Sequence, residues 1–441
     1  MSARERRCHP FGALRIFVAL GGTILAAAIP GAVPAAAQPA VFEWAAALES
    51  AGTLIDHGVG PVLDSLDSLS ASISVSHDLG PGTMTYTAGA GLFYMPQRLL
   101  PGQGRLDAFL VYPSAVSIAW DLEPARLVDP WFRVVLGRME AREPSGLLLE
   151  NPYAPAQLLD GLSLEFRWKN LYAGIEAGYL GLLDKRINRI IFTLPDALEL
   201  ADTSHYGAPP RGLAILRLEA DDLLVGQSVG LFGIWQKDFR QGPPQFDSWY
   251  IGALVNGPIV PLLRQASTVV VGISVPAGGS GSAGMLPGIT SGAGLLISSQ
   301  VAYKLPGTLL HEAWFSVLWA SSPGSGLQAF PALAGPPVSL AYTEPLSDVV
   351  KLELGADAVL PVTPTGAVLK PSLAVRLLLA PSSAVPSDLS FSSAGPYVGT
   401  EIETVLEYVP LRGFNVSAHA GGLIAVQGIL PCLRLDAGIQ L

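Results

Sequence analysis

Apolar and polar residues alternate one by one along much of the C-terminal third of this 441-residue chain. In one such segment Val350 and Leu352 alternate with Lys351 and Glu353. The same period recurs in 372–379, 401–408 and 433–441. A period of two residues gives a β-strand one apolar and one polar face. Repeated strands of about ten residues with this pattern are typical of a transmembrane β-barrel.

The composition favours lipid as the partner of the apolar face. Half of the residues are hydrophobic, the mean hydropathy is +0.42, and only 14% are charged. After residue 37 the chain has no 18-residue apolar run without charged, glycine or proline interruptions, which argues against membrane-spanning helices. A soluble β-protein would also alternate, but it needs more charge on its outer face. A soluble sandwich therefore remains the alternative fold.

The first 37 residues have the pattern of a secretory signal peptide. Arg4 and Arg7 belong to a basic start, an apolar stretch covers 16–28, and three alanines end at Ala37. Small residues at this spacing are typical of a cleavage site. We therefore expect residues 1–37 to be removed on export, with an uncleaved anchor helix as the alternative.

Charge and cysteine content exclude several classes of protein. The chain has 26 basic and 36 acidic residues, of which four and one lie in the first 37, so the remainder has an excess of 13 acidic side chains. That excess argues against nucleic-acid binding. Cys432 is the only cysteine beyond the signal, so no intrachain disulfide is possible. Because no cluster has metal-ligand spacing, we expect no metal and no cofactor.

Residues 38–69 differ in pattern from the rest of the chain. Trp44, Leu48 and Ile55 fit helical spacing, and Pro61 interrupts the segment. This pattern predicts two short helices. We expect them to form either a periplasmic lead-in that packs against the base of the barrel or a plug inserted into it.

Strand signals dominate from residue 70, so we assign 70–441 to the barrel. The candidate strands are 84–94, 114–121, 131–141, 160–169, 171–183, 211–220, 227–238, 247–257, 267–275, 294–304, 309–321, 348–360, 366–379, 397–408, 413–426 and 431–441. Single-chain bacterial barrels have an even number of strands, so we expect about 16, with 14 or 18 as alternatives. Short and long links alternate along most of the chain, as periplasmic turns and external loops do in outer-membrane barrels.

The overall plan resembles Gram-negative-type outer-membrane β-barrels from about residue 84 to residue 441. The final alternating strand resembles the assembly signal of that family, although Leu441 stands where the family usually has an aromatic residue. The segments 137–138, 144–146 and 160–164 resemble parts of porin-like spirochaete outer-membrane proteins. The resemblance implies passive uptake of small solutes across the outer membrane, with membrane lipid and the barrel-assembly machinery as partners.

If the apolar positions face lipid, the charged residues at the alternating positions line the lumen. The candidates are Glu165, Arg167, Lys169, Glu176, Arg217, Glu219, Lys351, Glu353, Asp357, Lys370, Arg376, Glu401, Glu403, Glu407, Arg434 and Asp436. Basic and acidic side chains that together line a water-filled lumen form a porin-like arrangement, in which rings of charge set the preference for cations or anions. The acids Glu401, Glu403 and Glu407 indicate a weak preference for cations. The alternative is that these charges pair with one another and pack a closed lumen.

The sequence thus predicts a passive outer-membrane channel for small polar solutes, without a chemical step. Two alternatives are a plugged transporter of hydrophobic substrates and a surface adhesin that binds through the loop 184–210. A hydrolase is the enzymatic rival, because Ser417 and His419 share one strand face. No acid lies next to them in the sequence, so we interpret them as polar residues of the lumen wall. The oligomeric state stays open.

Overall fold

The computed structural model describes strands and the turns that adjoin them. The described residues are 41–56, 61–78, 82–97, 106–122, 130–149, 157–182, 211–224, 226–239, 245–277, 292–306, 309–322, 330–331, 348–362, 367–381, 396–411, 414–425 and 428–440. Within those ranges no residue is helical, so none of them belongs to a helix that could cross a membrane. The expected signal peptide, residues 1–37, lies outside them.

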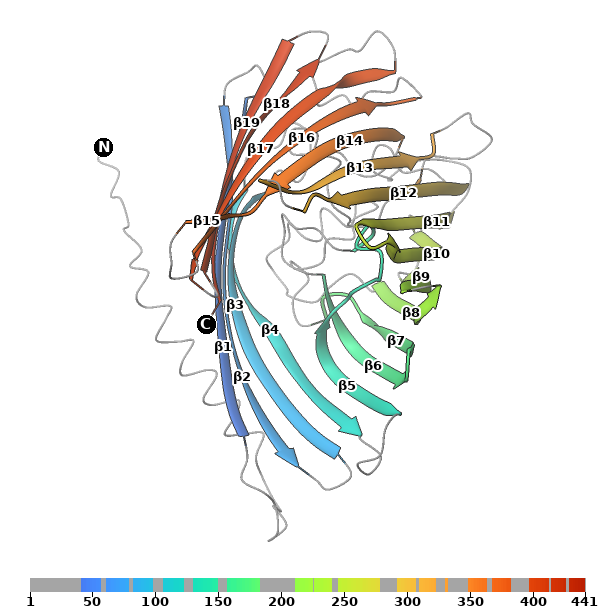
Figure 1. Cartoon of the computed structure of the whole chain (residues 1–441). Helices are drawn as coiled ribbons and strands as arrows, with labels where there is room; N and C mark the ends of the chain where they lie inside the picture. The colour runs from blue at the N-terminus through green and yellow to red at the C-terminus, as the bar shows by residue number, and fades with distance from the viewer. Residues whose placement is uncertain are drawn as a thin grey trace, which may run out of the picture.

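Nineteen strand segments belong to one antiparallel sheet (Figure 1). They are β1 (Val41–Asp56), β2 (Pro61–Asp78), β3 (Gly82–Gln97), β4 (Leu106–Leu122), β5 (Trp131–Glu140), β6 (Leu158–Trp168), β7 (Leu171–Tyr179), β8 (Arg211–Leu224), β9 (Gln227–Asp238), β10 (Gln245–Val260), β11 (Leu263–Ala277), β12 (Gly292–Lys304), β13 (Leu310–Ala320), β14 (Val349–Ala358), β15 (Leu360–Pro361), β16 (Val368–Leu379), β17 (Tyr397–Leu411), β18 (Phe414–Ala425) and β19 (Gly428–Gln440).

Each strand pairs with the next one along the chain, in an up-and-down order. The segments β14 and β15, separated only by Val359, both pair with β16 and act as one interrupted strand. The described residues therefore form an 18-stranded sheet. The first and last strands also pair, from Ala47 opposite Gln440 to Ile55 opposite Cys432. The order of neighbours is therefore cyclic.

The prediction of helices in residues 38–69 is wrong for the part of that segment that the structure describes. Residues 41–56 form β1, and 61–78 form β2, which pairs with β1 along its length. The spacing of four between Trp44 and Leu48 misled the prediction, because four is both close to one helical turn and a multiple of the strand period. Small alanine, serine and glycine residues further weaken the two-residue signal in this stretch.

The two N-terminal strands explain why the described sheet has more strands than the predicted 16. Every one of the 16 predicted ranges overlaps a strand between β3 and β19, and β1 and β2 raise the number in the described sheet to 18. That number is the upper alternative of the prediction rather than its central value.

The links differ at the two ends of the strands. At one end, the short-turn end, most links are brief, such as 169–170 and 412–413. At the other, the long-loop end, most are longer, such as 180–210 and 321–348. The link 426–427 is a short exception at the long-loop end. The alternation of link lengths is therefore present along most of the sheet.

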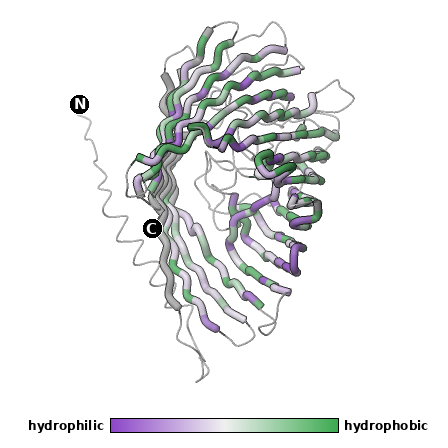
Figure 2. The backbone as a smooth tube through the Cα atoms, viewed as in Figure 1, coloured by the Kyte–Doolittle hydropathy of each residue, from purple (hydrophilic) through white to green (hydrophobic). Residues whose placement is uncertain are grey.

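The two faces of the curved sheet differ in chemistry. Large apolar side chains such as Phe166, Ile251, Val271 and Leu354 are exposed on one face, which we call the convex face. The residues between them point to the opposite, concave face. Figure 2 shows the resulting alternation of hydrophobic and more polar residues along many strands. The buried Glu176 lies on the concave face, between exposed apolar neighbours.

An apolar cluster covers the concave face near the long-loop end. Phe232, Phe246 and Tyr250 of the wall are buried there together with Leu148 and Phe330, which come from the long links. The Tyr250 hydroxyl donates a hydrogen bond of 2.6 Å to the Pro331 carbonyl. Segments of two long links are therefore folded against the concave face.

Three glycines lie opposite one another on β5, β6 and β7. Gly137 faces Gly161, which faces Gly178. A Cβ atom on Gly161 would collide with the Ala177 carbonyl oxygen and lie 2.5 Å from the Gly178 Cα. These backbones approach so closely that no side chain fits between them.

We expect Gly161→Ala to lower the free energy of unfolding by about 1–3 kcal/mol, because backbone atoms must move to admit the methyl group. Gly233→Ala is the matched control, because a Cβ atom there has no neighbour nearer than 3.8 Å. Urea unfolding in lipid vesicles measures both. Equal stability of the two variants would contradict the close approach.

Candidate functional site

Fifteen of the 16 predicted lumen residues lie on the concave face. They alternate with exposed apolar residues of the convex face, such as Leu354, Val375, Ile402 and Leu433. Lys169 is the exception, because it lies in the turn between β6 and β7 with a positive φ of 52°. Its ammonium group is 5.2 Å from the centre of the Trp168 ring, at the edge of the sheet.

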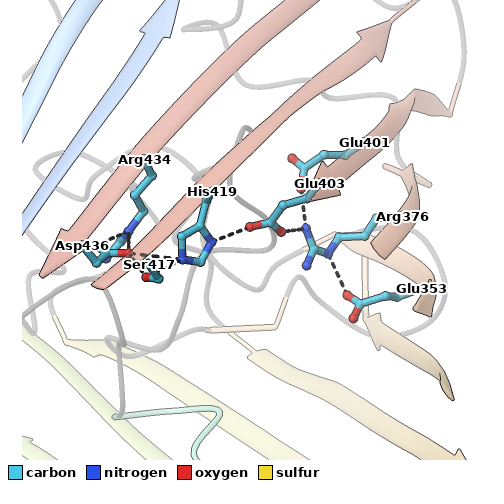
Figure 3. Close-up of polar contacts among 8 residues, drawn as sticks. All are labelled: Glu353, Arg376, Glu401, Glu403, Ser417, His419, Arg434 and Asp436. Atoms are coloured by element: carbon cyan, nitrogen blue, oxygen red, sulfur yellow. Dashed lines mark hydrogen bonds and ion pairs between the residues drawn. The ribbon is translucent and has the colours of Figure 1, made fainter. Parts of the chain in front are cut away.

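Eight of the polar residues on the concave face form one continuous network across five neighbouring strands. Figure 3 draws all of them except Lys351, together with Ser417. We call this network the charged ladder. Its members are Lys351 and Glu353 of β14, Arg376 of β16, Glu401 and Glu403 of β17, His419 of β18, and Arg434 and Asp436 of β19.

Arg376 is the centre of the charged ladder. Its Nε donates to Glu353 at 2.7 Å, and one terminal nitrogen donates to Glu401 at 2.7 Å and also to Glu403. The sheet register produces this arrangement, because Glu353, Arg376 and Glu401 lie directly opposite one another on three strands. One guanidinium thus joins three carboxylates, which suits its several donors in a fixed plane.

Trp314 of β13 supports the first carboxylate of the ladder. Its indole nitrogen donates to Glu353 at 2.8 Å. A Cβ atom on Gly355 would collide with the indole ring, so the glycine leaves the space that the ring occupies. Lys351 lies 3.6 Å from the same carboxylate. Glu353 is therefore held from three sides.

His419 connects the two ends of the ladder. Its Nδ1 lies 2.8 Å from Glu403, and its Nε2 lies 3.2 Å from Asp436. Both nitrogens can donate to these carboxylates only in the imidazolium form. Arg434 donates to Asp436 at 2.7 Å from its Nε. With the imidazolium, the ladder has four positive and four negative groups.

The hydrolase alternative is tested by the surroundings of Ser417. Its hydroxyl oxygen lies 3.3 Å from His419 Nε2, and Glu403 supplies the acid that the sequence did not reveal. However, Asp436 lies 3.2 Å from the same His419 nitrogen. An imidazolium between two carboxylates cannot accept the serine proton, so this arrangement of His419 does not suit the general base of a catalytic triad.

Two smaller ion pairs lie elsewhere on the concave face. Lys370 of β16 is 3.2 Å from Glu407, and Arg217 of β8 contacts Glu176. All three acids that indicated a cation preference therefore have a basic partner, since Glu401 and Glu403 both contact Arg376. The other predicted residues on this face, outside the ladder and these pairs, are Glu165, Arg167, Glu219 and Asp357.

Sequence reasoning missed several members of this wall. Trp314 has the same strand parity as Ser316, which lies opposite Glu353, but an aromatic ring gives no signal of a polar role. Buried ion pairs of Arg138 with Asp160 and of Arg211 with Asp238 also escaped notice. Among the described residues, no group of three or more histidine, cysteine or acidic residues could hold a metal ion.

Comparison with known proteins gives likenesses of fold. No family model and no curated protein matches the chain. The solved structure of OccK2 (OpdF) of Pseudomonas aeruginosa is similar with a TM-score of 0.57 and 13% identity, covering 91% of this chain and 97% of that one. OprD, an outer membrane protein of the same organism, gives a TM-score of 0.53 and 9% identity, covering 91% and 93%. OccK2 has also been solved in complex with glucuronate; that structure has a TM-score of 0.54 and 11% identity, covering 91% and 98%.

These likenesses support the all-β, up-and-down architecture over nearly the whole chain. Identities this low concern the fold alone, and the chemistry of the concave face has to be argued from this chain's own residues. The narrower resemblance to spirochaete proteins stays a prediction.

Removal of the central cation should destabilise the fold. We expect Arg376→Gln to lower the free energy of unfolding by about 3 kcal/mol or more, because three carboxylates with little exposure lose their shared partner. Lys370→Gln is the control, because its side chain is 41% exposed and its pair with Glu407 should contribute at most about 1 kcal/mol. Urea unfolding in lipid vesicles compares the two, and similar losses would argue against the central role of Arg376.

Proposed function

We propose that the chain forms a closed, 18-stranded transmembrane β-barrel that acts as a porin-like, passive channel for small polar solutes. The cyclic pairing through β1 and β19 supports closure. Short links at one end suit periplasmic turns, and long links at the other suit external loops. The likeness to OprD, an outer membrane protein, supports the same location.

The charged ladder on the concave face is the observation that carries this proposal. The opposite face presents exposed apolar residues such as Ile251 and Leu354, which lipid would solvate. Charged side chains prefer water, and on the lipid side arginine or lysine costs about 2–4 kcal/mol at the midplane. The two faces together therefore favour lipid outside and water inside. Barrels of about 16–18 strands leave room for an aqueous channel.

The remaining parts of the proposal follow from export to the outer membrane. We propose residues 1–37 as a cleaved signal peptide, and outer-membrane lipid and the barrel-assembly machinery as partners. Residues 41–78 supply β1 and β2, so we assign this segment to the barrel wall instead of a lead-in or plug.

The plugged transporter of hydrophobic substrates remains the second candidate. The apolar cluster near the long-loop end, with Leu148, Tyr250 and Phe330, favours it by narrowing the concave side. Each of these three side chains is almost fully buried, so the cluster is already filled by the chain itself. The charged ladder, on β14 to β19, favours polar solutes. The adhesin alternative depends on loop 184–210, which lies outside the described residues.

Conductance tests the channel directly. Purified protein refolded into planar bilayers should show discrete conductance steps. In a Cys432→Ala background, Thr87→Cys places a thiol on the concave face and Ala88→Cys places one on the convex face of the same strand. A charged, water-soluble thiol reagent should reduce conductance through the Thr87→Cys variant only. Absence of steps, or equal block of both variants, would overturn the proposal.

The apolar face tests the membrane location. Ile251 has 68% of its surface exposed on the convex face, so Ile251→Arg should lower stability in lipid vesicles by about 2–4 kcal/mol. Ile251→Ala is the size control and should cost less. The measurement is urea unfolding of vesicle-inserted protein. A protein that dissolves as a monomer without detergent and tolerates the arginine would contradict a lipid-facing surface.

A further inference from the structure

We propose that this channel favours polar solutes that carry no net charge over cations and anions of similar size. The inference rests on the proposed channel function and adds the class of its substrates. It derives from the balance of charge in the charged ladder, which differs from the single-sign rings that make a pore ion-selective.

The charged ladder presents both signs in close alternation. Arg376 lies between Glu353 and Glu401, and His419 lies between Glu403 and Asp436. Each ion pair of the ladder joins a basic group to an acidic one, at distances of up to 3.6 Å. Opposite charges this close cancel at the distance of a passing solute, so the ladder creates little net potential.

The groups of the ladder that a solute can reach also have both signs. Among the acids, Asp436 has 25% of its side chain exposed and Glu353 has 13%; among the basic groups, Lys351 has 19%, His419 has 17% and Arg376 has 15%. Glu401, by contrast, is fully buried. A solute therefore meets hydrogen-bond donors and acceptors interleaved along the wall, without a field that attracts one ionic sign.

A second group of polar side chains on the concave face consists of hydroxyl groups. On β2 and β3, Ser74 and Thr87 lie 3.1 Å apart, and Ser76 and Thr85 lie 2.9 Å apart, each pair through its hydroxyl groups. In the sheet, β1 lies between β19 and β2, and β3 follows β2. Hydroxyl groups both donate and accept, so this arc extends the hydrogen-bonding wall beside the ladder.

The passage of a solute along such a wall depends on the free energy required to remove water from that solute. A neutral hydroxylated or zwitterionic solute can exchange its water for paired donors and acceptors as it passes. An ion of either sign gives up part of its hydration and meets no compensating potential. Discrimination against net charge should therefore be similar for both signs.

Three sugars of the same ring size test the inference: glucose, glucuronate and glucosamine, with charges of zero, minus one and plus one at neutral pH. Proteoliposomes containing the full mature chain should swell fastest in glucose and more slowly, by similar amounts, in the other two. Faster swelling in glucuronate or in glucosamine would overturn the inference and leave the channel intact. No swelling in any sugar and no conductance would overturn the proposed function as well.

Reversal potentials under a salt gradient give a second readout. The wild-type channel should have a cation-to-anion permeability ratio near one. Asp436→Asn should shift the reversal potential toward anion preference, and Lys351→Gln should shift it toward cation preference. Glu140→Gln is the control, because Glu140 pairs with the exposed Arg142 at the long-loop end of β5. A strongly selective wild-type channel, or shifts in the same direction, would overturn the inference.

Discussion

Backbone hydrogen bonding between β1 and β19 is the interaction on which the rest of the structure depends. In a bilayer, each unpaired backbone amide or carbonyl costs several kcal/mol, because no water reaches it. A sheet with two free edges would leave such rows exposed. Pairing of β1 with both β2 and β19 gives each strand two neighbours. In the proposed barrel this pairing leaves no free edge, and the side chains divide into one face toward lipid and one toward water.

The charged ladder follows from that division and from the sheet register. Antiparallel pairing places Glu353, Arg376 and Glu401 directly opposite one another. The register of the backbone therefore brings these side chains within reach of one another. A pre-positioned pair loses less conformational entropy than two long side chains that meet on a free surface. The neighbouring Trp314 excludes water from one side of Glu353 and donates to it. The ladder therefore stabilises the contacts between neighbouring strands and also makes this part of the concave face polar.

The sequence predicted what depends on local pattern and missed what depends on register. Alternation around Leu354, Val375 and Ile402 placed the neighbouring charges on one face without any knowledge of the fold. It could not tell which charges would meet, because pairing of Glu403 with His419 depends on how β17 and β18 align. The strands β1 and β2 were missed for another reason. Small residues there leave few large side chains to mark a period, and a spacing of four satisfies helix and strand alike.

The concave face has two chemically different regions. Tyr250 of β10 and Phe330 belong to the apolar cluster, whereas Arg376 and His419 belong to the charged ladder on β14 to β19. Packed apolar side chains resist displacement, so the cluster can restrict the width available to a solute. They carry no charge and so cannot select by sign. Ion pairs differ, because the electrostatic field that they produce acts on the charge of a solute more than on its size. In the proposed channel, the width of the lumen and its charge therefore depend on different side chains, so each can change through substitutions that leave the other unaltered.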